Sequence, residues 1–207
     1  MEIGPGGTPY QRADVLLELR YPDETEAKKQ RGGTPSLQTR KPVVYYEGGV
    51  LPFADREFDY VVCSHVLEHV DDVEFFLSEM FRVGDKGYVE YPTIYYEYLY
   101  NFSVHSNVFK YQDGVLYYLK KADVPLDVFL PVQRMFFRSL ELGHTDFVDR
   151  FGHIMFEGFE WHQPFSCART KSIRQVAADN LGSIPPRVHG TGILARIQRA
   201  LCSMARG

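Results

Sequence analysis

The sequence predicts an α/β fold with a mostly parallel sheet, and one strand–helix–strand unit carries most of this prediction. Residues 60–63 (YVVC) form a short apolar run rich in β-branched side chains, which is typical of a buried strand. In residues 73–83, apolar side chains recur at helical spacing with acidic residues between them. Residues 87–91 (GYVEY) are typical of a second strand, which ends before Pro92. Such a unit makes its two strands parallel neighbours through a right-handed crossover.

Two further strands are predicted before this unit. Residues 14–19 (DVLLEL) form one and residues 43–46 (VVYY) the other, which leads into a loop at Gly48 and Gly49. The polar segment between them is broken by prolines and glycines and holds a short predicted helix at residues 24–31. Glu18 lies at a strand end, where nucleotide-binding α/β proteins hold ribose hydroxyls. The alternative for Glu18 is an exposed carboxylate with no ligand.

A glycine cluster, residues 4–7 (GPGG), opens the chain. Such a cluster bends the backbone sharply and lets a ligand approach it closely. An ordinary glycine-rich turn is the alternative, since turns of this composition are common.

Composition bounds the class of protein. The chain has 207 residues, of which 44% are hydrophobic and 14% aromatic, so it can bury a core and is not generally disordered. Its net charge of −4 gives no general attraction to nucleic acid. No apolar run approaches the roughly 20 residues that span a bilayer. The first residues do not resemble a signal peptide, and three cysteines without a CxxC motif favour a reduced, cytoplasmic chain.

Four segments together carry a family resemblance. They are residues 2–7 (EIGPGG), 51–62 (LPFADREFDYVV), 64–70 (SHVLEHV) and 79–87 (EMFRVGDKG). In this order they resemble the first motif, the segments on either side of the fourth strand, and the turn before the fifth strand of class I S-adenosylmethionine-dependent methyltransferases of the type 11 kind. The resemblance covers residues 1–95 and implies a Rossmann-like three-layer sandwich that binds S-adenosyl-L-methionine.

The resemblance also implies which residues surround the cofactor. Glu2, Gly4, Pro5, Gly6 and Gly7 would border its amino-acid part, Glu18 would take the ribose hydroxyls, Gly49, Val50 and Leu51 would lie beside the adenine, and Ser64, His65 and Leu67 would line the site from the fourth strand. The activated methyl group then needs only a nucleophile held in line with the S–CH3 bond.

The sequence departs from this family in three places. Only residues 8–13 separate the glycine cluster from the second strand, whereas a crossover helix needs at least about 10–12 residues, so we expect the first helix to be missing or reduced to one turn. Almost nothing precedes the first strand, so either the start is late or the sheet is truncated. The loop after the third strand lacks the acid that often receives the adenine amino group, which leaves backbone contacts for that role.

His65 and His69 have the i, i+4 spacing of a metal-binding pair. No third ligand follows at a motif-like spacing, so the sequence predicts no metal site. Glu68, Asp71 and Asp72 are expected to favour the start of the following helix through its dipole.

The segment after the fifth strand is predicted to cover the substrate, as residues 94–150 inserted into the methyltransferase domain. Residues 105–121 predict a β-hairpin with its turn at 112–114. The inserted segment is rich in tyrosine, most of all at residues 94–100 (IYYEYLY), which indicates either a pocket for a flat or apolar acceptor or half-exposed strand residues. His105 is the candidate general base if the acceptor is a hydroxyl, with a structural histidine as the alternative.

Residues 127–142 predict a helix interrupted at Pro131, with Phe129, Val132, Met135, Phe136 and Leu140 in its apolar stripe. Residues 152–165 are expected to supply the last strands. The methyltransferase domain is therefore predicted to span residues 1–165.

Residues 166–207 form a basic tail, with seven Lys or Arg residues against one acid. Residues 193–204 predict a basic amphipathic helix that docks on the chain's own acidic domain, pairs with a second subunit as a homodimer or heteromer, or lies on an anionic membrane surface. Docking or pairing is favoured, partly because the missing first helix leaves a face to cover. No motif supports nucleic-acid binding.

The sequence thus predicts an S-adenosyl-L-methionine-dependent methyltransferase that acts on a small-molecule acceptor. The alternative is a catalytically silent fold that serves as a partner or scaffold subunit. A nicotinamide-dependent oxidoreductase is disfavoured, because the glycine cluster lacks the following helix whose N-terminus would hold a pyrophosphate.

Overall fold

The computed structural model describes residues 1–30 and 37–177. Its strands are β1 (Glu2–Ile3), β2 (Leu16–Leu19), β3 (Val43–Tyr46), β4 (Val61–Ser64), β5 (Gly87–Pro92), β6 (Asn107–Gln112), β7 (Val115–Lys120), β8 (Phe156–Trp161) and β9 (Ser166–Arg169). Its helices are α1 (Glu24–Gln30), α2 (Val73–Val83), α3 (Ile94–Tyr100), α4 (Leu130–Glu141), α5 (Asp146–Met155) and α6 (Ile173–Val176), with short 3-10 helices at Leu67–His69, Lys121–Asp123 and Leu126–Phe129.

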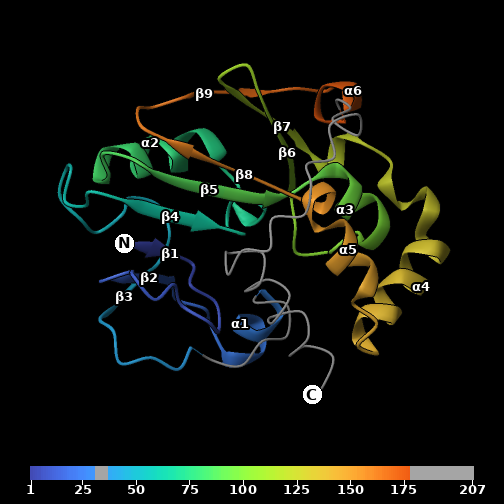
Figure 1. Cartoon of the computed structure of the whole chain (residues 1–207), viewed down its shortest axis with the longest axis horizontal. Helices are drawn as coiled ribbons and strands as arrows, with labels where there is room; N and C mark the ends of the chain where they lie inside the picture. Colours follow the sequence, from blue (N-terminus) through green and yellow to red (C-terminus); the bar gives the residue numbers. More distant parts are fainter. Residues whose placement is uncertain (31–36, 178–207) are drawn as a thin grey trace.

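The central sheet has six strands in the order β3-β2-β1-β4-β5-β8 (Figure 1). All neighbours are parallel except β8, which runs antiparallel to β5. The order β3-β2-β1-β4-β5 is that of a Rossmann-like sheet. The strands stay parallel, but the order in which the chain adds them reverses between β1 and β4. This arrangement confirms the predicted α/β fold with a mostly parallel sheet.

The core lies between the sheet and α2. That helix buries Val73, Phe76, Leu77, Met80 and Val83 at the predicted helical spacing. Asp72 is its N-cap and accepts a hydrogen bond from the Phe75 N–H at 3.0 Å. Gly84 ends it where a Cβ atom would lie 2.4 Å from Val61 Cγ2, so the close approach of helix and sheet requires glycine.

The predicted absence of the first helix is confirmed. In the described chain between Ile3 and Leu16 there is no helix, and the connection is a loop. The Tyr10 N–H donates to the Glu2 carboxylate at 2.5 Å and ties this loop back to β1. A connection this short still returns the chain to a parallel strand beside β1.

The predicted hairpin is also confirmed, and it builds a second sheet in the order β6-β7-β9. Its turn places Asp113 and Gly114 at φ +51° and +81°, the left-handed pair that favours such sequences at a two-residue turn. The second sheet packs against the main core, because Phe109, Leu116 and Tyr118 bury themselves in the same cluster as α2.

The segment between β5 and β8 holds α3, the hairpin, α4 and α5. In Figure 1, α3, α4 and α5 gather beyond the carboxyl ends of β4 and β5. Aromatic side chains of α3 and β8, together with Leu140, Val148 and Met155, form a separate core there. This helical cover therefore stands over the end of the sheet at which ligands bind in such folds.

One helix prediction is wrong in detail. Pro131 does not interrupt a helix but is the second residue of α4, a position where its missing N–H costs nothing. Val132 and Met135 are 47% and 63% exposed rather than part of a core stripe. The helix docks instead through buried Gln133, whose amide donates to the carbonyls of Tyr98 and Leu126 at 3.0 and 2.7 Å. The predicted amphipathic helix at residues 193–204 lies outside the described residues.

Candidate functional site

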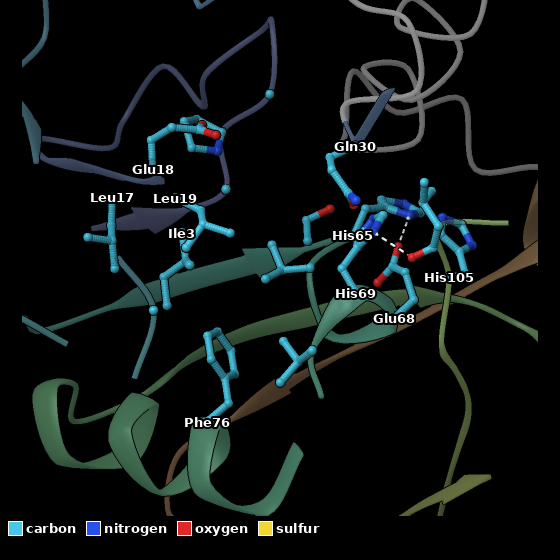
Figure 2. A pocket seen from close by; sticks show the side chains of 18 of the residues that line it. Ile3, Leu17, Glu18, Leu19, Gln30, His65, Glu68, His69, Phe76 and His105 are labelled. Carbon is cyan, nitrogen blue, oxygen red and sulfur yellow. Dashed lines mark hydrogen bonds and ion pairs between the residues drawn. The ribbon is translucent and has the colours of Figure 1, made fainter. Parts of the chain in front are cut away.

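A cavity of about 620 Å³ opens at the carboxyl ends of β1, β2 and β4, where the strand order reverses (Figure 2). This is the position at which open α/β sheets bind their ligands. One end is bordered by the glycine cluster and Glu18, and the other by His65, Glu68, His69 and His105. Among the predicted residues, Glu2, Gly4, Pro5, Gly6, Gly7, Glu18, Gly49, Ser64, His65 and His105 all line it.

The glycine cluster turns the chain at the end of β1. Gly4 and Gly6 have φ values of +59° and +58°, which L side chains rarely adopt. A Cβ atom on Gly4 would lie 2.6 Å from Val66 Cγ2, so this residue has a packing reason to be glycine. Gly6 has no atom near its would-be Cβ, and its exposed backbone faces free space. The loop therefore offers bare backbone to a ligand in the cavity.

Glu18 is buried, with only 2% of its surface exposed, yet it lines the cavity at the end of β2. Gly49 lies across from it after β3, with φ +77° and open space where a side chain would stand. A buried carboxylate beside bare backbone suits the two hydroxyls of a ribose and the edge of a flat base.

Three predicted cofactor residues do not line this cavity. Val50 is 65% exposed, whereas Leu51 and Leu67 are buried in the core. The Leu51 N–H donates to Glu79 of α2 at 2.8 Å, so this residue anchors the loop after β3.

His65 joins two buried carboxylates at the end of β4. Its Nδ1 lies 3.3 Å from Glu68 Oε1, and its Nε2 lies 3.4 Å from Glu90 Oε1. Figure 2 shows His65 beside Glu68. Ser64 donates to the same Glu90 oxygen at 3.0 Å. Burial alone lowers the pKa of His65, but the two carboxylates outweigh it and raise the pKa to about 10. Conversely, burial raises the pKa of Glu68, and His65 more than offsets this to lower it.

His69 and His105 meet on the other side of Glu68. Their rings are 4.8 Å apart at 90°. His105 Nδ1 lies 2.5 Å from Glu97 Oε1, and the second oxygen of Glu97 accepts from Lys121 at 2.6 Å. His69 Nδ1 lies 3.2 Å from the Val104 carbonyl, and burial lowers the pKa of His69, which favours a neutral ring.

Sequence reasoning missed the three acids that organise this end of the cavity. The sequence predicts that Glu68, Asp71 and Asp72 favour the start of α2 through its dipole, but Glu68 is completely buried, and Asp72 is the residue that caps the helix. Glu90 and Glu97 stand alone in apolar runs, YVEYP and YYEYLY. A single acid inside a run that is otherwise buried is a usable signal, because a buried carboxylate needs a partner.

The lining of the cavity is acidic. Six carboxylate residues contribute to it, namely Glu2, Glu18, Glu47, Glu68, Asp71 and Asp72, and the described lining contains no Lys or Arg. Such a surface creates a negative potential inside a concave site. It favours a ligand that carries positive charge and disfavours one that carries a pyrophosphate.

Comparison with known proteins agrees with this class of α/β protein. Residues 21–88 match the family model described as methyltransferase domain. The resemblance to class I S-adenosylmethionine-dependent methyltransferases that the sequence predicted is thereby confirmed. The matched residues run from the end of β2 to β5 and do not include the glycine cluster. No curated protein matches the chain.

Several solved structures are similar to parts of the chain. The YcgJ protein of Bacillus subtilis is 19% identical with a TM-score of 0.32, over 48% of each chain. The complex of the Trm112 methyltransferase activator with a putative methyltransferase from Haloferax volcanii gives 13% identity and a TM-score of 0.42, over 79% of this chain and 81% of that one. An S-adenosylmethionine-dependent methyltransferase from Mesorhizobium loti is 14% identical with a TM-score of 0.39, over 77% of this chain and 88% of that one.

Within residues 1–30 and 37–177, no helix is long and apolar enough to cross a membrane.

Proposed function

We propose that this chain transfers a methyl group from S-adenosyl-L-methionine to a small-molecule acceptor. The observation that carries the proposal is the combination of a glycine turn at β1, a buried Glu18 at β2 and an acidic lining without Lys or Arg in the described cavity. The cofactor is a sulfonium cation with an ammonium group, so a negative site attracts it. A nicotinamide dinucleotide carries a pyrophosphate and is repelled.

Each part of the cofactor has a candidate partner among these residues. The bare backbone of residues 4–7 suits its amino-acid part, Glu18 suits the ribose hydroxyls, and Gly48 and Gly49 suit the adenine edge. The methyl group on the sulfonium is already activated, so what the protein must supply is alignment. Ser64 and His65 line the cavity from the end of β4, and His65 lies at its histidine end.

The acceptor would then lie under the helical cover. Tyr96, Phe102 and Phe156 line that part of the cavity and give it an aromatic wall. His105 remains the candidate general base for a hydroxyl acceptor, because Glu97 holds its Nδ1 and leaves Nε2 for a proton. Such a pocket suits a small, partly apolar molecule.

Calorimetric titration with S-adenosyl-L-methionine and S-adenosylhomocysteine tests the proposal. We expect saturable binding of both by the full chain. Glu18→Ala should weaken both affinities at least about tenfold, since a buried hydrogen-bonding carboxylate is worth roughly 1.5–3 kcal/mol. Glu141→Ala is the matched control, because that carboxylate is exposed on α4 and pairs with exposed Arg138. If neither compound binds, the proposal of an active methyltransferase is wrong, and the alternative of a catalytically silent partner subunit is left.

A further inference from the structure

The histidine end of the cavity holds a second group of residues with its own chemistry. Glu68, His69 and His105 each offer one potential ligand atom, and these three atoms lie within 4.8 Å of one another; Figure 2 shows the three residues side by side. All three residues line the cavity. They come from segments 36 residues apart, so the fold and not local spacing brings them together.

We propose that Glu68, His69 and His105 bind a divalent transition-metal ion such as Zn²⁺. Two imidazole nitrogens and one carboxylate oxygen are a donor set that divalent first-row metals prefer. Zinc sits about 2.0–2.1 Å from such ligands, which places tetrahedral ligands about 3.3 Å apart. The three ligand atoms must therefore close by about 1.5 Å at most, a change within reach of side-chain rotation.

The surroundings of both rings fit ligation through Nε2. Metal-binding histidines almost always donate their other ring N–H to a carboxylate or a backbone carbonyl. His105 has Glu97 at its Nδ1, at 2.5 Å, and Lys121 fixes that carboxylate in turn. His69 has the Val104 carbonyl at its Nδ1, at 3.2 Å. Both rings are thus oriented by partners that leave Nε2 as the coordinating nitrogen.

The third ligand is a buried carboxylate with unused capacity. Glu68 is fully buried, and among the described residues neither of its oxygens accepts a hydrogen bond. Its ion pair with His65 at 3.3 Å uses only one oxygen. A buried carboxylate is costly unless it is paired and fully hydrogen-bonded, and a cation would supply the missing interaction.

The backbone around these ligands is held firmly. The Asn107 amide donates to the carbonyls of Leu67 and Val70 at 3.1 and 2.6 Å, and the Ser106 N–H donates to the Glu68 carbonyl at 2.7 Å. The short helix that carries Glu68 and His69 is therefore fixed to the strand that follows His105. A metal site needs ligands that are positioned before the ion arrives.

Three protein ligands leave further coordination positions toward the cavity. If the proposed methyl transfer is correct, on which this step rests, an oxygen of the acceptor would complete the coordination sphere. A metal lowers the pKa of a bound hydroxyl, so its proton can pass to solvent water without a general base from the protein. A metal-bound His105 is then not the base.

The test titrates the full chain, without a histidine tag and without S-adenosylmethionine, with Zn²⁺ in a calorimeter. We expect one saturable site, and an at least tenfold loss of affinity in His69→Ala and in His105→Ala. His153→Ala is the control, since His153 is exposed on α5 and away from the cavity. Glu68→Gln should weaken Zn²⁺ binding as well, and circular dichroism identifies any variant that fails to fold.

Co²⁺ supplies an independent readout of the same site. The wild-type chain should give an intense visible absorption typical of a low-coordinate N,O site, and His105→Ala should lose it. The metal site is wrong if the wild-type chain shows no saturable Zn²⁺ binding. It is also wrong if the Zn²⁺ affinity and the Co²⁺ spectrum are unchanged in both His69→Ala and His105→Ala. Neither result depends on S-adenosylmethionine, so these experiments test the metal site alone. The cofactor titration tests the proposed methyl transfer separately.

Discussion

At the scale of single residues, His65 is the junction of the cavity. Its backbone is in the left-handed region at φ +56°, a conformation that costs of order 1–3 kcal/mol for a non-glycine residue. Its N–H donates to the Glu90 carbonyl at 2.9 Å, and its ring lies between the carboxylates of Glu68 and Glu90. The ion pairs hold the strained residue in place, and the strained residue keeps two buried acids apart.

A substitution separates these two effects. Asn tolerates the left-handed region but carries no charge, so His65→Asn keeps the backbone and removes the cation. Two buried carboxylates then lose their partner, and we expect a loss of about 3–5 kcal/mol in the free energy of unfolding, measured with urea. Arg138→Ala, which breaks an exposed ion pair, should cost less than about 1 kcal/mol. A similarly small loss for His65→Asn would show that the ion pairs do not hold this junction.

At the scale of elements, Arg82 of α2 ties the loop after β3 to the helix. Its guanidinium donates to the carbonyls of Leu51 and Phe53 at 2.9 and 2.7 Å and to the carboxylates of Asp55 and Glu79 at 2.9 and 2.7 Å. The Leu51 N–H completes the set by donating to Glu79. This network joins the LPFAD loop to the RV end of α2, although the two lie far apart in the sequence.

The same network predicts a pH dependence. Arg82 lowers the pKa of Glu79 below its ordinary value of 4.5; burial opposes this, and the Leu51 N–H adds to it. A carboxyl whose pKa is lower in the folded state stabilises the fold above its unfolded pKa, and this contribution is lost as the pH falls through the folded pKa. We therefore expect the free energy of unfolding to fall less steeply between neutral pH and about pH 3 in Glu79→Gln than in the wild type. Urea titrations at several pH values across this range measure the free energy of unfolding of both proteins.

Glu141→Gln is the control for that comparison, because its exposed ion pair is worth little. A wild-type pH slope that Glu79→Gln leaves unchanged would mean that other carboxyls govern the acid sensitivity of this protein.

Elements with a clear period were predictable from the sequence, and contacts between distant segments were not. The helical spacing of α2 predicts its buried face, and two alternating runs around the turn at residues 112–114 predict the hairpin. The run IYYEYLY forms α3, but its tyrosines occupy almost every position and give no period. The gathering of Glu68, His69 and His105 depends on how the hairpin packs on the helix after β4, which no local spacing encodes.

The end of the cavity at the glycine cluster was predictable for a different reason. Gly4, Gly6 and Glu18 lie where β1 and β2 end, and the carboxyl ends of parallel neighbours meet at one edge of a sheet. Val50, Leu51 and Leu67 were assigned by resemblance alone, and they lie outside the cavity lining because one faces solvent and two pack in the core. Topology therefore places residues better than motif position does when a helix of the family is missing.

At the scale of the whole molecule, the cavity is lined both by residues at the end of the central sheet and by residues of the helical cover, which has a hydrophobic core of its own. Its walls come from the glycine cluster, the ends of β2 and β3, the segment after β4, and the helical cover. The cover has its own aromatic core, and the second sheet is linked to β8 through the Lys110–Glu157 ion pair at 2.6 Å. A ligand that touches all these walls adds contacts between them that the free protein lacks.

Ligand binding should therefore stabilise both ends of the cavity together. At about 100 times its dissociation constant, S-adenosylhomocysteine should raise the free energy of unfolding by about 2.7 kcal/mol. Hydrogen exchange should slow at the glycine cluster and also at residues 64–72 and 102–105, because the walls on both sides are held by one ligand. Glu18→Ala, with an affinity about tenfold weaker, should reduce this stabilisation to about 1.4 kcal/mol at the same ligand concentration and weaken the protection at both ends of the cavity. Protection confined to residues 4–7 and 18 would mean that the cofactor half works alone and that the histidine end responds only to the acceptor or to the metal.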